Sequence, residues 1–283
     1  MLTLGRPFAS YHLWSLVAPA TGQERWHCQM RRGFIKARQH EPQVKQLLAQ
    51  ATIPQRIGIL AQKGVYEFHH HRQLLKQADG VEKVAQILKL SKVSVEIQQR
   101  VRQILKNYHD APLLLGKRII QLTRGDEGFP QPIIIDQQNY YFRLYAAMDC
   151  VVIESDSTLH IIDFKTGKSA FDQRQALVYL LAARYLYPQQ EAVASFYNLE
   201  RRKTSDLITL TPNQLDAVEH ELAVIAGKHQ QDLQHYQANP GKFSVIFPPN
   251  PGNHCRYCPL HRICDFSASK SSKLRLADKS AYH

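Results

Sequence analysis

The sequence predicts one α/β domain in which a helical N-terminal part precedes strands and helices that alternate along the chain. Up to about residue 108, apolar residues recur at spacings of three and four, which is typical of amphipathic helices. Between residues 132 and 162, short runs rich in β-branched and aromatic residues are separated by polar turn residues, which is typical of strands. No flexible linker separates the two patterns, so we expect the helices to form an insertion in, or a cap on, the same domain.

The boundaries of the elements follow from turn and capping residues. Gly80 and Ser91 interrupt the helical region, which is expected over residues 40–108. A β-meander is expected to begin after residue 113, and Thr211-Pro212 supplies the N-cap and first-turn proline of a long final helix. Predicted helices cover residues 42–51, 55–77, 80–88, 93–108, 172–186 and 211–236, and predicted strands cover residues 132–135, 140–145, 150–153, 158–162 and 192–199.

The domain is expected to span residues 1–265, with its core over residues 113–240. Residues 266–283 are basic, rich in Ser and Lys and poor in apolar side chains, which predicts a disordered tail.

The charge balance narrows the class of partner. The 283 residues carry 36 Lys and Arg against 24 Asp and Glu, a formal net charge of +12. This excess favours a polyanion such as nucleic acid, although a solvated basic surface would give the same balance. Basic segments at residues 31–32, 117–118 and 201–203 are suited to a phosphate backbone if they are not simply solvated. Since no apolar stretch approaches the roughly 18 residues that cross a bilayer, we expect no membrane partner.

Cysteine usage indicates a reducing compartment. Five cysteines are an odd number, and three lie close together near one end, which fits a metal site better than a disulfide framework. The stretch at residues 8–20 resembles a signal peptide only faintly, because Ser10, His12 and Ser15 interrupt its apolar run. We therefore expect a cytoplasmic protein.

The most informative stretch is a predicted hairpin whose strands end in acidic residues. If residues 155–157 form the turn, the antiparallel register places Asp149 opposite Asp163. Such neighbours have Cβ atoms roughly 4.5 to 5.5 Å apart, close enough for two carboxylates to bind one divalent cation. Period two places Lys165 on the face of Asp163, where its amine can orient or deprotonate a water. This pattern indicates a phosphodiesterase site, although a solvated surface hairpin can end in the same residues.

A helix predicted after the hairpin adds a second motif. It carries Gln175 and Tyr179 four residues apart and therefore on one face. The order of these motifs, from the first acid through the lysine to the helix with Gln and Tyr, resembles the RecB-like branch of the PD-(D/E)XK nuclease superfamily. The resemblance implies a restriction-endonuclease-like fold with a central mixed sheet flanked by helices. It also implies that Gln175 and Tyr179 contact DNA or support the site, while plain packing on the sheet stays open for this pair.

The same resemblance implies roles for the residues of the hairpin. Asp149, Asp163 and the backbone carbonyl of Phe164 would bind Mg²⁺ or Mn²⁺, and Lys165 would serve the hydrolytic water. RecB-like members also carry a metal-binding histidine after a helical glycine, which here points to His69 in the run of residues 69–71. An exposed histidine patch is the alternative for this run.

Three cysteines within residues 255–264 suggest a second metal site. Cys255, Cys258 and Cys264 need a fourth ligand, and Cys28 is the natural one, so a shared metal would join the N- and C-terminal parts. One early and three late cysteines at this spacing resemble RecB-like nucleases that carry a 4Fe-4S cluster, which implies the same cluster here. Zinc stays open as an alternative, with a histidine in place of Cys28. That histidine would be His27, His254 or His261.

These observations predict a metal-dependent deoxyribonuclease. The resemblance further implies an exonuclease that acts on single-stranded ends in DNA repair, recombination or defence. Since the sequence contains no helicase motif, unwinding would come from a helicase or another partner in a repair or defence complex. The alternative is a nuclease-fold subunit that binds DNA without cutting it.

Overall fold

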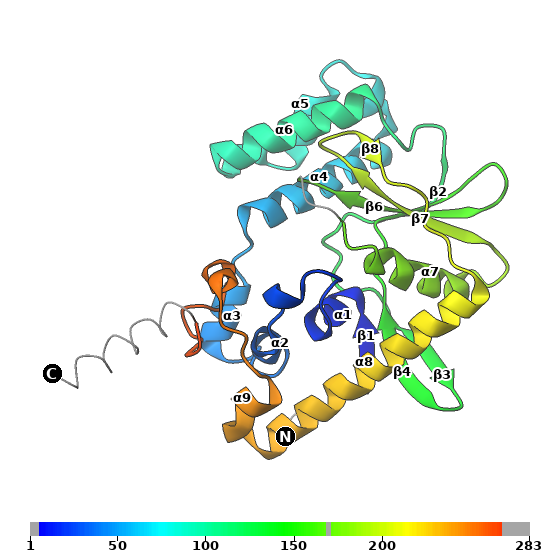
Figure 1. Ribbon diagram of the computed structural model, residues 1–283. Helices are drawn as coiled ribbons and strands as arrows, with labels where there is room; N and C mark the ends of the chain where they lie inside the picture. The colour runs from blue at the N-terminus through cyan, green and yellow to red at the C-terminus, as the bar shows by residue number, and fades with distance from the viewer. Residues whose placement is uncertain (1–5, 168–170, 268–283) are drawn as a thin grey trace. The chain divides into compact units, whose positions relative to one another are not determined.

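The computed structural model describes residues 6–167 and 171–267 (Figure 1). The chain is divided into two compact units, each built from segments that are separate in the sequence. We call residues 51–133 and 144–220 the sheet unit, and residues 1–50, 134–143 and 221–283 the cysteine unit. The expectation of one domain over residues 1–265 stays a prediction. All but two residues of the predicted tail lie outside the described residues.

The sheet unit is built on a five-stranded mixed sheet. Its strand order is β2-β5-β6-β7-β8, in which β6 and β7 are parallel and the other pairs are antiparallel. A parallel pair requires a crossover connection, and helix α7 (Arg174–Leu186) supplies it between β6 and β7. The prediction of an α/β fold with a mixed sheet is thereby confirmed. The strands are β2 (Arg118–Leu122), β5 (Cys150–Ile153), β6 (Leu159–Lys165), β7 (Ala192–Asn198) and β8 (Lys203–Thr204).

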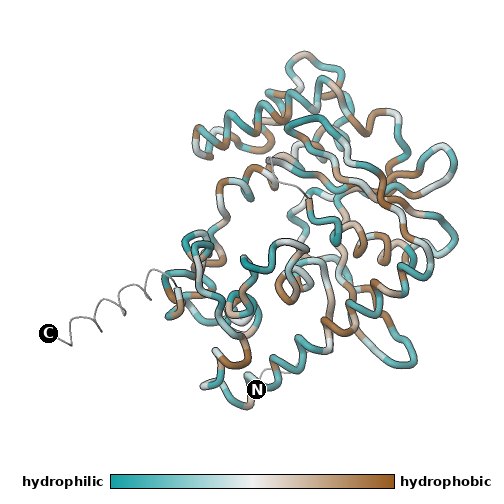
Figure 2. The backbone as a smooth tube through the Cα atoms, viewed as in Figure 1, coloured by the Kyte–Doolittle hydropathy of each residue, from teal (hydrophilic) through white to brown (hydrophobic). Residues whose placement is uncertain are grey.

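Helices cover both faces of this sheet. Apolar side chains of α4 (Ile53–His70), α5 (Gly80–Ile87) and α6 (Val95–Asp110) form one core with side chains of β5, β6 and β7. Helix α7 forms a second core on the opposite face, as Figure 1 shows. Because β6 is covered on both sides, five of its seven residues are buried. In Figure 2 the strands of this unit and α7 are accordingly among the most hydrophobic segments.

Local chemistry explains why α4 begins and packs where it does. Thr52 Oγ1 accepts the Gln55 N–H, and Gln55 Oε1 accepts the Thr52 N–H, which completes a capping box. Gly64 lets α4 approach α6 closely, because a Cβ at this position would lie 2.1 Å from Leu105 Cδ2. The predicted helices at 42–51, 80–88 and 93–108 thus appear as α3 (Pro42–Leu48), α5 and α6 with ends shifted by up to three residues. The helix predicted at 55–77 is too long, because α4 ends at His70 and a separate 3-10 helix covers Arg72–Lys76.

The meander predicted after residue 113 is wrong in one respect. Strands β3 (Ile133–Gln137) and β4 (Tyr140–Tyr145) form the predicted hairpin, but β4 does not continue into the sheet with β5. It pairs instead with β1 (Phe8–Ser10) in a separate three-stranded sheet of order β1-β4-β3. On the side of β5 away from β6, the neighbouring strand is β2, which the sequence did not reveal as a strand. Local patterns specify a strand but not its partner.

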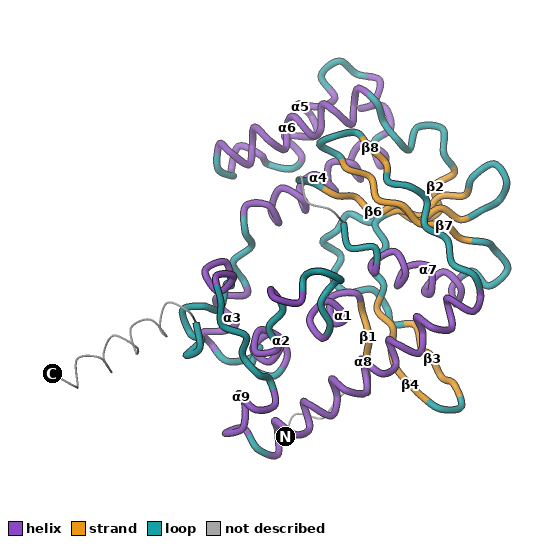
Figure 3. The backbone as a smooth tube through the Cα atoms, in the orientation of Figure 1, coloured by secondary structure: helices purple, strands orange, loops and turns teal. Residues whose placement is uncertain are grey.

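The cysteine unit is mainly helical (Figure 3). Its apolar core includes Met30, Phe34, Phe243 and Phe247. Arg32 is buried beside this core and is neutralised by Asp232, whose Oδ2 lies 2.7 Å from Nη2 of Arg32. Besides α3, the helices are α1 (Tyr11–Val17), α2 (Gln29–Lys36), α9 (Phe243–Ile246) and the part of α8 (Pro212–Ala238) that begins at residue 221.

Among residues 6–167 and 171–267, no helix combines the length and the hydrophobicity needed to cross a membrane.

Candidate active site

The hairpin of β5 and β6 places two acidic residues opposite each other. Glu154 N–H donates to the Thr158 carbonyl at 2.9 Å, which closes the predicted turn at residues 155–157. Cys150 pairs with Ile162, and extending this register by one residue sets Asp149 opposite Asp163, whose neighbour Phe164 donates its N–H to Asp149 Oδ2 at 2.8 Å. The register predicted from the sequence is therefore confirmed.

Asp163 is almost fully buried and its two oxygens have different surroundings. Oδ1 lies 2.8 Å from both Gln175 Nε2 and the Tyr179 hydroxyl. Oδ2 forms an ion pair with Lys165 Nζ but has no hydrogen-bond partner of normal geometry. A buried carboxylate oxygen with only this contact is an available ligand for a cation.

Gln175 links the lysine to the carboxylate. Its Oε1 accepts a hydrogen bond of 2.8 Å from Lys165 Nζ, and its Nε2 donates to Asp163 Oδ1. Nε2 also lies 2.6 Å from the hydroxyl of Tyr179, which is one turn further along α7. The four-residue spacing therefore puts both side chains on the sheet face that carries Asp163, where they contact the acid rather than only pack against the strands.

Tyr179 is suited to act as a hydrogen-bond donor at all ordinary pH values. Burial raises the pKa of its hydroxyl, and the negative charge of Asp163 raises it further. The hydroxyl also lies 2.8 Å from the Ala147 carbonyl, which ties α7 to the segment that enters β5.

Asp149 is held by the chain on both sides. Its Oδ2 accepts the Phe164 N–H at 2.8 Å, and its Oδ1 accepts Gln62 Nε2 at 2.9 Å. Burial, and then the charge of Asp163, raise the pKa of the Asp149 carboxyl, while these hydrogen bonds oppose the rise. A cation bound beside Asp149 would offset the negative charge that opposes its ionisation.

Gln62 is the residue that the sequence analysis missed. It lies on α4 one residue after the buried Ala61, and it also donates to Thr123 Oγ1 at 3.1 Å. Gly125, with φ +84°, passes so close that a Cβ there would lie 2.7 Å from the Gln62 amide. The only sequence signal for this role was a polar residue beside the apolar stripe of α4, which many helices show without functional meaning.

His69 has a different partner from the two acids. Its Nε2 lies 2.7 Å from the Tyr108 hydroxyl, and burial lowers its pKa to about 4. His70 stacks on Tyr66, and His71 lies 3.7 Å from Glu67. The histidine run therefore makes contacts within the helical region, and the role of His69 as a metal ligand stays a prediction.

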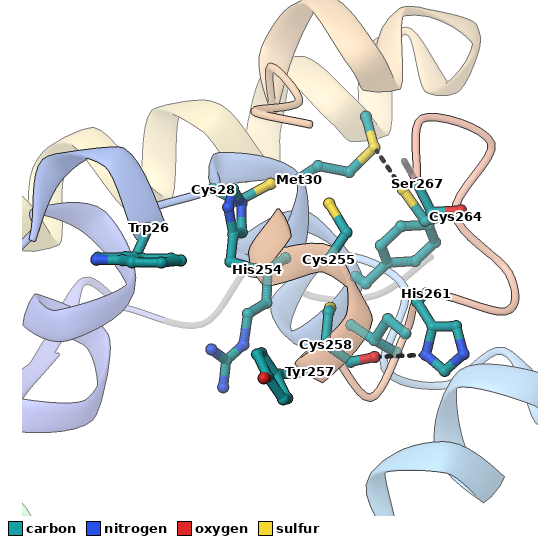
Figure 4. A pocket seen from close by; sticks show the side chains of 13 residues that line it. Trp26, Cys28, Met30, His254, Cys255, Tyr257, Cys258, His261, Cys264 and Ser267 are labelled. Atoms are coloured by element: carbon teal, nitrogen blue, oxygen red, sulfur yellow. Dashed lines mark hydrogen bonds between the residues drawn. The ribbon is translucent and has the colours of Figure 1, made fainter. Parts of the chain in front are cut away.

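The four predicted cysteine ligands line one cavity of about 210 Å³ in the cysteine unit. Figure 4 shows Cys28 on one side of the cavity and Cys255, Cys258 and Cys264 beside it. Asn250 Nδ2 donates to the His27 carbonyl at 2.8 Å, so the segment before Cys28 is attached to the one before Cys255. The fold thus brings Cys28 to the three late cysteines, which follow it by more than 200 residues in the chain.

Neighbouring groups affect these thiols. Burial raises the pKa of Cys258 and of Cys264, and charge on the other cysteines raises both further. Cys264 Sγ lies 3.7 Å from Met30 Sδ. Among the three histidines considered for zinc, His27 and His261 contact backbone carbonyls, whereas Nε2 of His254 is buried with no partner.

Comparison with known families decides the family. Residues 26–265 match the sequence model of the PD-(D/E)XK nuclease superfamily. The chain belongs to this superfamily. Membership indicates a nuclease, which hydrolyses phosphodiester bonds, and a DNA substrate. The match spans both the carboxylate site and the cysteine cavity. The curated proteins contain no match to the chain.

PD-(D/E)XK nucleases typically use Mg²⁺ or Mn²⁺, and the two acids fit such an ion. Within the described residues, no three His, Cys, Asp or Glu side chains are arranged to hold a metal. Mg²⁺ needs fewer protein ligands than this, because it retains several waters and binds one or two carboxylates. The available Oδ2 of Asp163 and the raised pKa of Asp149 are the observations that favour a cation here.

The same test applies to the cysteines, for which a 4Fe-4S cluster or structural zinc needs four ligands. They share one cavity, yet in the described part of the chain no three of them have the arrangement of metal ligands. The 4Fe-4S cluster and the zinc alternative therefore stay predictions.

The remaining candidates have structural roles or are exposed. Cys150 is fully buried in the core, and burial raises its pKa to about 12. Lys117 Nζ binds Glu154 at 2.7 Å. Arg31 and the segment at 201–203 are exposed, whereas Arg32 is buried.

Proposed function

We propose that this PD-(D/E)XK protein is a Mg²⁺- or Mn²⁺-dependent deoxyribonuclease of the RecB-like branch. It hydrolyses phosphodiester bonds at the site of Asp149, Asp163 and Lys165. The observation that carries the proposal is the network at the end of β6, in which Gln175 bridges Lys165 and Asp163 while the hairpin register sets Asp149 opposite Asp163.

Each residue has a role that follows from its contacts. Asp149 and Asp163, with the backbone carbonyl of Phe164, hold the cation, which supplies a Lewis acid and offsets phosphate charge when bound. Lys165 Nζ, held by Gln175 Oε1 at 2.8 Å, orients the attacking water or takes up its proton.

The polar residues around the acids keep them in place. Gln175 and Tyr179 fix the Oδ1 atom of Asp163, so that Oδ2 stays directed toward the cation and Lys165. Gln62 and the Phe164 N–H fix Asp149 in the same way. His69 stays a candidate ligand, which its contact with Tyr108 does not support.

Single-stranded ends are the proposed substrate, and exonuclease action is the proposed mode. Both rest on the resemblance to RecB-like nucleases, and the net charge of +12 supports a nucleic-acid substrate. A cytoplasmic role in DNA repair, recombination or defence, with a helicase as partner, is proposed on the same basis.

The cysteine cavity is proposed to hold a 4Fe-4S cluster. The support is that Cys28 lines the same cavity as the three late cysteines. Zinc is the alternative, and the unpartnered Nε2 of His254 identifies the histidine that would then take part.

A cleavage assay tests the nuclease proposal. Purified protein is incubated with end-labelled single-stranded DNA and with Mg²⁺, Mn²⁺ or EDTA. We expect digestion by the wild type with either metal ion, and none with EDTA or with Asp163→Ala. Binding without products under all conditions would overturn the proposal in favour of a non-cleaving DNA-binding subunit. A circular single strand tests the exonuclease mode. An exonuclease digests the linear strand from an end and leaves the circular strand intact.

A further inference from the structure

Two exposed aromatic rings stand at the cysteine cavity. Trp26 is 46% exposed and Tyr257 is 74% exposed, although both side chains line the cavity. Each ring has a guanidinium from the neighbouring residue over it, Arg25 at 4.7 Å from the Trp26 ring centre and Arg256 at 4.7 Å from the Tyr257 ring centre. Single exposed apolar side chains are ordinary, so what distinguishes these two rings is that both line one cavity and each carries a guanidinium over it.

Contacts with neighbouring segments hold Trp26 in place. Trp26 makes an edge contact with His254 at 5.9 Å and 85°. Asn250 Nδ2 donates to the carbonyls of Arg25 and His27, which fixes the backbone on both sides of Trp26. Tyr257 lies between Cys255 and Cys258, whose side chains point into the cavity in Figure 4. Ordering the Trp26 ring in advance reduces the entropy that a ligand must overcome.

The charge around the rings favours a polyanion. The two chain segments that contain the rings, residues 24–31 and 253–265, present four exposed arginines. The acidic residues of these segments are Glu24 and Asp265. Flat apolar rings interleaved with guanidinium groups match a single nucleic-acid strand, whose bases expose π-faces and whose phosphates carry charge. A duplex offers no free base faces, because its bases stack on each other. The arginines are Arg25, Arg31, Arg256 and Arg262.

We propose that Trp26 and Tyr257 form a stacking surface for unpaired bases of single-stranded DNA, with the adjacent arginines contacting its phosphates. This inference rests on the proposed nuclease function for the identity of the polymer, and it adds a binding site outside the catalytic network. The surface lies wholly within the cysteine unit.

Tryptophan fluorescence gives a direct readout. The chain has two tryptophans, and Trp14 is only 3% exposed, so quenching by an added oligonucleotide reports on Trp26. The protein is titrated in the Asp163→Ala background, which prevents cleavage under the proposed function. We expect oligothymidine to quench the fluorescence and an abasic strand of the same length to quench it far less. Equal quenching by both strands would overturn the stacking proposal.

Matched variants separate stacking from charge and from misfolding. Trp26→Ala and Tyr257→Ala are each expected to weaken oligothymidine binding about 10-fold, as measured by fluorescence anisotropy, and abasic-strand binding less than about 2-fold. Trp26→Phe and Tyr257→Phe keep a ring and are expected to bind within a few-fold of the parent. Phe129→Ala removes a ring that is 91% exposed in the sheet unit, and it serves as the control without effect.

The outcomes distinguish this surface from the catalytic site. The proposal would be overturned if the alanine variants bound oligothymidine as tightly as the parent, or if they lost equal affinity for oligothymidine and for the abasic strand. The rings would then serve a different partner. Cleavage of a short substrate by the otherwise wild-type chain tests the nuclease function independently. Stacking without cleavage would support the surface while overturning the enzyme.

Discussion

The side-chain amide of Gln62 donates a hydrogen bond of 2.9 Å to the carboxylate of Asp149, which lies 87 residues further along the chain. Gln62 belongs to α4 and Asp149 immediately precedes β5, so the helical region directly contacts one of the two acids. The nearby Gly125 and the ion pair of Lys63 with Asp126, at 2.6 Å, hold a loop over this contact.

Replacing Gln62 is expected to impair catalysis. A hydrogen bond to a charged group contributes about 1.5 to 3 kcal/mol, so Gln62→Ala should reduce kcat about 10-fold or more. Because Gln62 is proposed to hold Asp149 and not the DNA, KM should change little. The measurement is steady-state cleavage of single-stranded DNA in Mg²⁺.

Gln86→Ala is the matched control, because Gln86 is an exposed glutamine on α5. It should cleave at the wild-type rate. A Gln62→Ala enzyme with normal kcat would show that Asp149 needs no support from α4.

The further variant His69→Ala tests the predicted histidine ligand. If it lost metal-dependent activity while remaining folded, His69 would be assigned to the site despite its contact with Tyr108.

Asp149→Asn is expected to stabilise the metal-free protein at neutral pH. Burial and the charge of Asp163 raise the pKa of Asp149 in the folded state. When the pKa of a carboxyl group is higher in the folded than in the unfolded chain, its contribution to stability is fully present below the pKa of the unfolded chain, about 4. This contribution is lost as the pH rises through the pKa of the folded state. The neutral variant avoids that loss, and we expect its unfolding free energy in EDTA at pH 7.5 to be higher by roughly 1 kcal/mol.

Added Mg²⁺ should then reverse the ranking. Binding at 100 times Kd stabilises a folded protein by about 2.7 kcal/mol, so the melting temperature of the wild type should rise while that of Asp149→Asn stays constant. Asp206→Asn, at an exposed carboxylate, should respond to Mg²⁺ as the wild type does. A wild type without any Mg²⁺ response would contradict the assignment of the acids.

Removing a cysteine of the cavity should release its metal. Protein purified without oxygen is expected to be brown and to contain about four iron atoms per chain, and Cys28→Ala or Cys255→Ala should be colourless and melt at a lower temperature. Cys150→Ala changes a fully buried core cysteine outside the cavity and should keep its iron. Colourless wild type that contains zinc, and loses it in His254→Ala, would replace the cluster by the zinc alternative.

His229 is expected to make the protein sensitive to mild acid. Burial, and then the positive charge of Arg32, lower its pKa from 6.5 to about 3 in the folded state. Between these values the unfolded chain binds more protons, so stability is present above pH 6.5 and falls as the pH decreases toward 3. This shift corresponds to a loss of roughly 2 kcal/mol between pH 6.5 and pH 5.

Urea unfolding at several pH values measures this effect. His229→Gln should show a shallower decline below pH 6.5 than the wild type, whereas His40→Gln, at an exposed position, should follow the wild type. Parallel curves for His229→Gln and the wild type would mean that His229 is protonated without cost in the folded protein.

Much of the acidic half of the site could be predicted because its geometry is local. A three-residue turn and the period of two in strands fix which residues of a hairpin face each other, and this was enough to place Asp149 opposite Asp163. A helix spacing of four put Gln175 and Tyr179 on one face, and both contact Asp163. These rules need only residues that are near each other in the chain.

The α/β class, most helices and strands and the opposition of the two acids could be predicted from local patterns, and the grouping of Cys28 with the three late cysteines was a prediction that agrees with the cavity they line. Tertiary structure decided that β4 leaves its neighbour β5 to pair with β1, that Gln62 contacts Asp149, and that His69 contacts Tyr108. The physical reason is that periodicity and capping describe a segment and its near neighbours. The partner of a strand edge or of a half-buried amide is selected by packing between segments far apart in the chain, and no local pattern contains that information.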